Sequence, residues 1–222
     1  MFTLYGCLRS RASRPWWLLT EAGADFAHEP VVQAYRLRDP SAPDAPFNTA
    51  SPAYLAINPQ GQIPALVVDD GQVLTESLAM TLWLARRLGG ALGPADLAEE
   101  GQMLQWAFLA GTAIEPAATD ILFTIARAEA ETPAGQGRLA AAAEALSRPC
   151  ARLEAHLAGA DGDWLLGARF TAADIVLAEC LRYAQPHPPA LAAFPRLRAW
   201  LARCQSRPAF QAMMRAREAE PA

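Results

Sequence analysis

Apolar and polar positions divide the chain into a first part with short strand-like runs and a second part with helical periodicity alone. In the first part, short apolar runs predict strands, and two longer amphipathic runs predict helices. The predicted order is strand 2–5, helix 16–22, strand 26–32, strand 65–68, strand 73–75 and helix 77–88. This β-α-β then β-β-α order indicates a mixed four-stranded sheet with helices on its faces.

Glycine, proline and aspartate mark the connections between these elements. Asp69-Asp70-Gly71 is a strong hairpin signal between the last two strands. Residues 39–52 contain four prolines together with Asp, Ala and Ser, which is typical of a long loop. Gly89-Gly90 stops the second helix, so residues 89–94 are predicted to be a linker.

The second part of the chain is predicted to be all helical. Residues 95–130 form a long helix or a helix pair, which Pro116 should bend. A core-facing stripe follows at steps of four and three residues: Leu139, Ala143, Leu146, Cys150, Leu153 and Leu157. Thr171 and Asp174 resemble a capping box, and the apolar helix after them should be the buried centre of its domain. We therefore expect an α/β domain at residues 1–88 and an all-α domain at residues 95–222.

Composition disfavours several classes of partner. The net charge of −4 argues against nucleic acid and anionic membranes as partners. The uninterrupted apolar runs are too short to span a bilayer, and the N-terminus reads as a strand without a basic signal region, so we expect a cytoplasmic protein. Four cysteines without a C-x-x-C pair indicate reduced thiols, and three histidines without ligand spacing predict no metal site.

The candidate chemistry lies in residues 58–66, N-P-Q-G-Q-I-P-A-L, and residues 75–80, T-E-S-L-A-M. Backbone groups of Ile63 lie beside a proline turn, and the Glu76 carboxylate and Ser77 hydroxyl lie at a predicted helix N-terminus. The unpaired N–H groups of such a helix end attract a carboxylate. Together these groups suit a small zwitterionic peptide, which carries both an amine and a carboxylate.

These two runs resemble the glutathione-binding segment of the glutathione S-transferase family, with its N-P-x-G-x-V-P-x-L and E-S-x-A-I patterns. The departures are conservative: Ile63 stands for Val and Met80 for Ile. The resemblance covers nearly the whole chain except the 39–52 loop. It implies a thioredoxin-like first domain, glutathione as co-substrate, a small apolar electrophile as second substrate, a role in detoxification, and a homodimer.

The resemblance also implies roles for individual residues. Gln62 is similar to the residue that holds the glycine carboxylate of glutathione, and Glu76 and Ser77 resemble the pair that holds the γ-glutamyl end. Pro64 matches a proline that is cis in the family, which exposes the backbone groups of Ile63 to the cysteinyl part. The alternative for Glu76 and Ser77 is simple helix capping.

The residue that activates the thiol is expected in the loop after the first strand. Five residues beyond Tyr5 is Ser10, in an R-S-R-A-S run similar to the R-S-S-C-S of the zeta class and, more loosely, to the theta-class serine. Ser13 is the rival, and a backbone amide of the same loop stays open. Pro15 favours Ser13 as helix N-cap, because proline is tolerated only in the first helical turn. Ser10 would then be free to face the sulfur.

The second substrate is expected to bind near Leu8, Trp106, Ala110 and Ala113, although aromatic residues at helical spacing are more often part of a core. Cys7 comes three residues before the position of the reactive cysteine in thiol-exchanging relatives, so we interpret it as a small residue packed under the loop.

Two other functions stay open: glutathione-dependent isomerisation of the zeta type, and a non-catalytic interaction module of the same fold.

Overall fold

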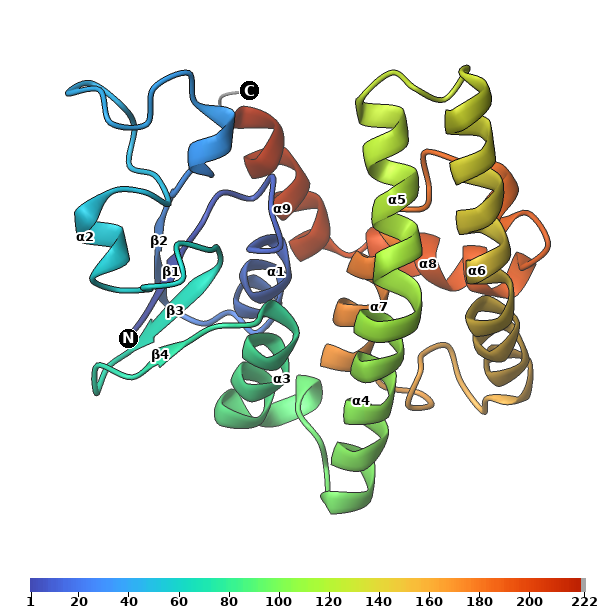
Figure 1. Cartoon of the computed structure of the whole chain (residues 1–222). Helices are drawn as coiled ribbons and strands as arrows, with labels where there is room; N and C mark the ends of the chain where they lie inside the picture. Colours follow the sequence, from blue (N-terminus) through green and yellow to red (C-terminus); the bar gives the residue numbers. More distant parts are fainter. Residues whose placement is uncertain (221–222) are drawn as a thin grey trace. The chain divides into compact units, whose positions relative to one another are not determined.

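The structure is a computed structural model that describes residues 1–220 (Figure 1). The chain forms two compact units. The first unit contains residues 1–84 together with the chain from Pro208 onward, and the second contains Ala85–Arg207.

The first unit is built on a sheet with strand order β2-β1-β3-β4. β1 is parallel to β2 and antiparallel to β3, and β3 is antiparallel to β4, so the predicted mixed four-stranded sheet is confirmed. Its elements are β1 (Phe2–Tyr5), α1 (Ser13–Glu21), β2 (Phe26–Glu29), the 3-10 turn η1 (Ala34–Arg36), α2 (Pro52–Leu55), β3 (Ala65–Val68), β4 (Val73–Leu74), α3 (Ser77–Leu88, whose last residues belong to the second unit) and α9 (Pro208–Ala219).

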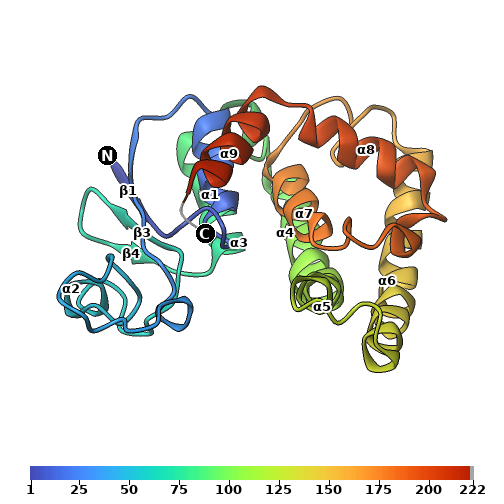
Figure 2. The same cartoon turned by 90° about the horizontal axis from the view of Figure 1, so that it is seen from above.

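The last helix packs with the first unit, which differs from the predicted second domain at residues 95–222. α9 lies beside α1 (Figure 2), and the rings of Trp17 and Phe210 meet edge to face with their centroids 4.9 Å apart. Trp17 is fully buried and Phe210 is nearly so. The helical periodicity predicted this helix. It did not show that the helix packs with the first unit, because periodicity carries no information about contacts between distant segments.

The second unit is all helical, as predicted. Its elements are η2 (Gly90–Leu92), α4 (Leu97–Leu109), the π-helical segment η3 (Ala110–Ile114), α5 (Glu115–Ala126), α6 (Pro133–Gly159), α7 (Ala172–Arg182), η4 (Pro188–Leu191) and α8 (Pro195–Gln205). α7 is its buried centre: every residue from Ala172 to Leu181 is buried. Pro116 does not break the long helix. It is the second residue of α5, in the first helical turn, where a missing N–H is tolerated, and the preceding segment Ala110–Ile114 is π-helical.

Within residues 1–220, the stretch Leu97–Ala126 has the length and hydropathy of a membrane span, with 39% of its apolar window buried. The core helices of water-soluble proteins have the same length and hydropathy, so one such helix is weak evidence for a membrane span. The sequence analysis considered only uninterrupted apolar runs, and this stretch is interrupted by Glu99, Glu100, Glu115 and Asp120.

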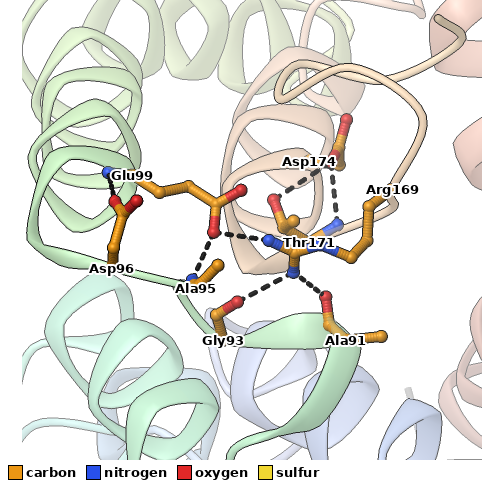
Figure 3. A network of polar contacts seen from close by, with 8 residues as sticks. All are labelled: Ala91, Gly93, Ala95, Asp96, Glu99, Arg169, Thr171 and Asp174. Atoms are coloured by element: carbon orange, nitrogen blue, oxygen red, sulfur yellow. Dashed lines mark hydrogen bonds and ion pairs between the residues drawn. The ribbon is translucent and has the colours of Figure 1, made fainter.

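The predicted linker is tied into the second unit by Arg169 (Figure 3). The Arg169 guanidinium donates to the carbonyl oxygens of Ala91 and Gly93, the latter at 2.9 Å, and forms an ion pair with Glu99. Asp96 caps α4 by accepting from the Glu99 N–H at 2.8 Å. The chain between α3 and α4 is therefore held by side-chain hydrogen bonds.

Candidate functional site

The loop after β1 lies against the proline turn that precedes β3. Tyr5 pairs with Ala65 across the sheet, so the residues just beyond each strand end meet at one edge. Gly6 has a φ of +139°, and a Cβ atom on it would lie 3.3 Å from the Cβ of Ile63 and 3.5 Å from the Cα of Pro64. Glycine is required here both for the backbone conformation and for this close approach. The Ile63–Pro64 peptide bond is cis, as predicted.

Ser10 lies in this loop, and its hydroxyl is engaged within it. The Ser10 Oγ donates to the Cys7 carbonyl oxygen at 2.6 Å and accepts from the Ala12 N–H at 3.1 Å. A hydroxyl can turn its hydrogen from one acceptor to another, so a thiolate placed beside Ser10 would compete with the Cys7 carbonyl for this donor.

Ser13 is not the N-cap of α1, so that prediction was wrong. Ala12 occupies the cap position with helical dihedral angles, and Ser13 is the first helical residue. The chain already winds before the helix, because the Ser13 N–H donates to the Ser10 carbonyl and the Arg14 N–H to the Arg11 carbonyl. The Ser13 Oγ donates to the same Ser10 carbonyl at 3.2 Å. Pro15 still falls in the first turn, where its missing N–H is tolerated.

The proline turn is held from below by two side chains. Tyr54 Oη and Asn58 Nδ2 both donate to the carbonyl oxygen of Gln62, at 2.5 and 2.7 Å. Tyr54 is fully buried, and burial raises the pKa of its phenol. The Gln62 side chain is exposed, so it is available to a ligand while its backbone is fixed.

Glu76 and Ser77 stand at the N-terminus of α3, as predicted. Glu76 has a φ of +65°, which is uncommon for a residue with a side chain, and strained backbone of this kind clusters at functional sites. Its side chain is exposed, while its carbonyl accepts the helical bond from the Met80 N–H at 2.9 Å. The carboxylate is therefore presented outward from a fixed backbone.

Arg14 was not among the predicted site residues, yet it contacts one of them. Its Nη1 donates to the Ser77 Oγ at 2.9 Å, and both side chains are buried. This bond joins the start of α1 to the start of α3. Because the Ser77 oxygen acts as acceptor, its own hydrogen remains to donate. The sequence signal was the position of Arg14 three and four residues before the buried Trp17 and Leu18, which places it on the core side of α1.

Cys7 is buried under the loop. Its Sγ donates to Gln33 Oε1 at 3.4 Å. Burial, and secondarily the negative charge of Glu220, raises the pKa of the Cys7 thiol. A thiol is nucleophilic only as thiolate, so this environment does not activate Cys7.

The four residues predicted for the second substrate belong to different units. Leu8 is buried in the first unit, and Trp106, Ala110 and Ala113 belong to the second. Within the second unit, the Trp106 ring packs edge to face on His156 at a centroid distance of 4.7 Å and is almost fully buried. Ala110 is fully buried as well. Ala113 alone lines an open groove of ≈ 390 Å³, formed by residues from η3, α5 and α6.

The fold and this arrangement agree with known proteins. The glutathione S-transferase N-terminal domain matches residues 9–87, and the C-terminal domain of the same family matches residues 114–208. Glutathione S-transferase 3 of Zea mays is 34% identical over 220 residues, which cover 94% of this chain and 90% of the maize protein. This chain belongs to the glutathione S-transferase family.

Two other members of the family are similar to this chain at comparable sequence identity. A maleylacetoacetate isomerase of Pseudomonas aeruginosa is 31% identical over 182 residues, which cover 77% of this chain and 76% of that protein. The crystal structure of a glutathione transferase from Methylococcus capsulatus superposes with a TM-score of 0.75 at 31% identity, covering 98% of this chain and 99% of that one. Membership assigns the thioredoxin-like fold to the first unit and glutathione transferase activity as the general reaction.

Proposed function

We propose that this transferase holds the thiol of glutathione as thiolate beside Ser10 and directs it at a small apolar electrophile. A free thiol has a pKa of about 8.5, so little of it is ionised at neutral pH. A hydroxyl that donates to the sulfur favours the charged form. The thiolate then forms a carbon–sulfur bond, and the leaving group departs with its electron pair. Detoxification in the cytoplasm is the role that fits this reaction.

The observation that supports this proposal best is the contact of the Ser10 loop with the Ile63–Pro64 turn through Gly6. Gly6 begins the loop that carries Ser10, so this closeness puts the start of that loop beside the turn whose backbone groups are expected to hold the cysteinyl part of the peptide. In this proposal Gln62 binds the glycine carboxylate, Ile63 and Pro64 align the cysteinyl backbone, and Glu76 and Ser77 hold the γ-glutamyl end. No metal takes part.

A second candidate is glutathione-dependent isomerisation of a dicarboxylic substrate. The similarity to the maleylacetoacetate isomerase favours it, and the R-S-R-A-S run at Arg9–Ser13 departs from the zeta pattern in two positions. Purified protein assayed with chlorodinitrobenzene and with maleylacetone separates the two reactions. Retention on glutathione-agarose without turnover of either compound would instead favour a non-catalytic interaction module.

Replacing Glu76 by alanine should raise the dissociation constant for glutathione by roughly tenfold or more, because a hydrogen bond to a charged group contributes about 1.5–3 kcal/mol. The dissociation constant of Glu76→Gln should lie between those of the native protein and Glu76→Ala, since glutamine keeps an acceptor oxygen without the charge. Calorimetric titration of the folded variants measures this effect. Asp70→Ala, an exposed change in the β3–β4 turn, serves as the control. Unchanged affinity in Glu76→Ala would remove Glu76 from the site.

We also propose that the protein is a homodimer. Three large apolar side chains lie seven and four residues apart along α4 and are exposed in the single chain: Leu97 at 83%, Leu104 at 43% and Phe108 at 68%. Exposed apolar residues that share one face of a helix are typical of a protein interface. Because proteins of this family typically pair their subunits, we expect the partner at this face to be a second copy of the chain.

Phe108→Glu should therefore convert the dimer to a monomer. Sedimentation equilibrium at micromolar concentration should give twice the 23.8 kDa chain mass for the native protein and the chain mass for the variant. Phe123→Glu provides the control, because Phe123 is also exposed, at 49%, but lies on α5. A native protein that sediments at the chain mass would contradict the dimer.

A further inference from the structure

Two successive backbone N–H groups in the Ser10 loop converge on one carboxylate. The Leu8 N–H donates to Oε1 of Glu220 at 2.5 Å, and the Arg9 N–H donates to Oε2 at 3.0 Å. Successive amides that point into the same concavity form an anion-binding site. Glu220 follows the last residue of α9, so the chain fills this site with one of its own carboxylates.

Three arginines surround the same stretch of backbone. The Arg9 guanidinium donates to the Glu220 carbonyl at 3.3 Å, and Arg217 donates to the Leu8 carbonyl at 2.6 Å. Arg36 donates to the Arg9 carbonyl at 3.3 Å. Charge-assisted bonds and nearby guanidinium groups stabilise an anion here. The charge of Glu220 also acts on the loop, since it is the second cause of the raised pKa of the Cys7 thiol.

We propose that the Leu8 and Arg9 amides form an anion site that Glu220 occupies in the free protein and that a carboxylate on the second substrate occupies when Glu220 moves aside. The site precedes Ser10 by one residue, so a ligand held there lies in the loop that is expected to face the thiolate. This inference rests on the proposed function. It gives the electrophile a more specific class: an apolar body that carries a carboxylate.

Glu220 follows the last residue of α9 and is not part of a helix or strand. Its release breaks the bonds to the Leu8 and Arg9 N–H groups and to the Arg9 guanidinium, and such a local opening costs less than unfolding of a helix or strand. While Glu220 occupies the site, an external carboxylate binds only the open fraction of molecules. If roughly one molecule in ten is open, removal of Glu220 raises the apparent affinity about tenfold.

Benzoate is the probe for this site, and the amide signals of Leu8 and Arg9 in isotope-labelled protein are the readout. In Glu220→Ala, benzoate should shift both signals saturably, with an apparent dissociation constant about tenfold lower than in the native protein. Benzamide, which is uncharged, should shift neither. Glu218→Ala is the matched control: it removes an exposed carboxylate two residues away and should respond like the native protein. Equal response of Glu220→Ala and the native protein, or no response in either, would overturn the inference.

Kinetics with two matched electrophiles extends the test. Chlorodinitrobenzoate and chlorodinitrobenzene both lose chloride as the thiolate forms the carbon–sulfur bond, but only the first carries a carboxylate. Glu220→Ala should lower the KM for chlorodinitrobenzoate several-fold and leave that for chlorodinitrobenzene unchanged. An equal fall for both would contradict a carboxylate site. If the native protein turns over neither compound, the proposed function fails, and the benzoate titration, which needs no glutathione, still decides the anion site.

Discussion

Replacing Ser10 by alanine should slow conjugation by roughly 10- to 100-fold at neutral pH and move the pH profile of the reaction upward. Lowering the pKa of a bound thiol by about two units requires about 2.7 kcal/mol. One charge-assisted hydrogen bond contributes about 1.5–3 kcal/mol, and the nearby helix N-terminus adds about 0.3–1 kcal/mol. Without the hydroxyl, a higher pH is needed to form the same fraction of thiolate. Steady-state rates between pH 6 and 10 with chlorodinitrobenzene measure both effects.

The loop contacts of Ser10 require a control for structural loss. Ser10→Ala also removes the bonds to the Cys7 carbonyl and the Ala12 N–H. Ser13→Ala removes a buried hydroxyl from the same turn and its bond to the Ser10 carbonyl. It should cost about 1 kcal/mol of unfolding free energy without moving the pH profile. Ser10→Thr should keep the profile, because it keeps the hydroxyl.

Glutathione affinity should change little in Ser10→Ala, since the peptide is expected to be held mainly by Gln62, Glu76 and Ser77. Full activity with an unshifted profile would mean that Ser10 is not the activator. The activator would then be Ser13 or a backbone amide in the same loop.

The sequence predicted elements whose signals are local. The β3–β4 hairpin followed from Asp69-Asp70-Gly71, and α3 was predicted with the bounds that it has, because the apolar spacing and the Gly89-Gly90 stop are both near in sequence. The buried centre α7 followed from its apolar surface and from the Thr171–Asp174 cap. Each of these depends on contacts within a few residues.

The sequence did not predict contacts between distant segments. The Arg14–Ser77 bond joins residues 63 positions apart, and the Glu220 contact with Leu8 joins residues 212 apart. The packing of α9 with the first unit is another contact between distant segments. Ser13 was assigned to the cap for another reason: proline restricts where a helix can start, but it does not reveal that residues before the helix already wind.

Asp174 should be the most sensitive position for stability. Its carboxylate is fully buried and accepts four hydrogen bonds: from the Leu165 N–H at 3.0 Å, the Trp200 indole at 2.9 Å, and the Thr171 N–H and hydroxyl at 3.0 and 3.3 Å. Burial raises the pKa of this carboxyl, and the donors act in the opposite direction. The Asp174 carboxylate thus joins the N-terminus of α7 (Figure 3) to α8, through Trp200, and to the segment before α7, through Leu165.

Asp174→Ala should lower the free energy of unfolding by about 3–5 kcal/mol, because it leaves several buried donors unsatisfied, each at a cost of about 1–3 kcal/mol. Asp174→Asn should cost less, since one oxygen still accepts while the amide N–H₂ faces donors. Asp96→Ala is the matched control: this aspartate caps α4 through a single bond at an exposed position and should cost about 1 kcal/mol. Urea unfolding of the three variants tests this order. If Asp174→Ala is no more destabilising than Asp96→Ala, the buried network does not hold the second unit together, and the packing of α7 alone accounts for its stability.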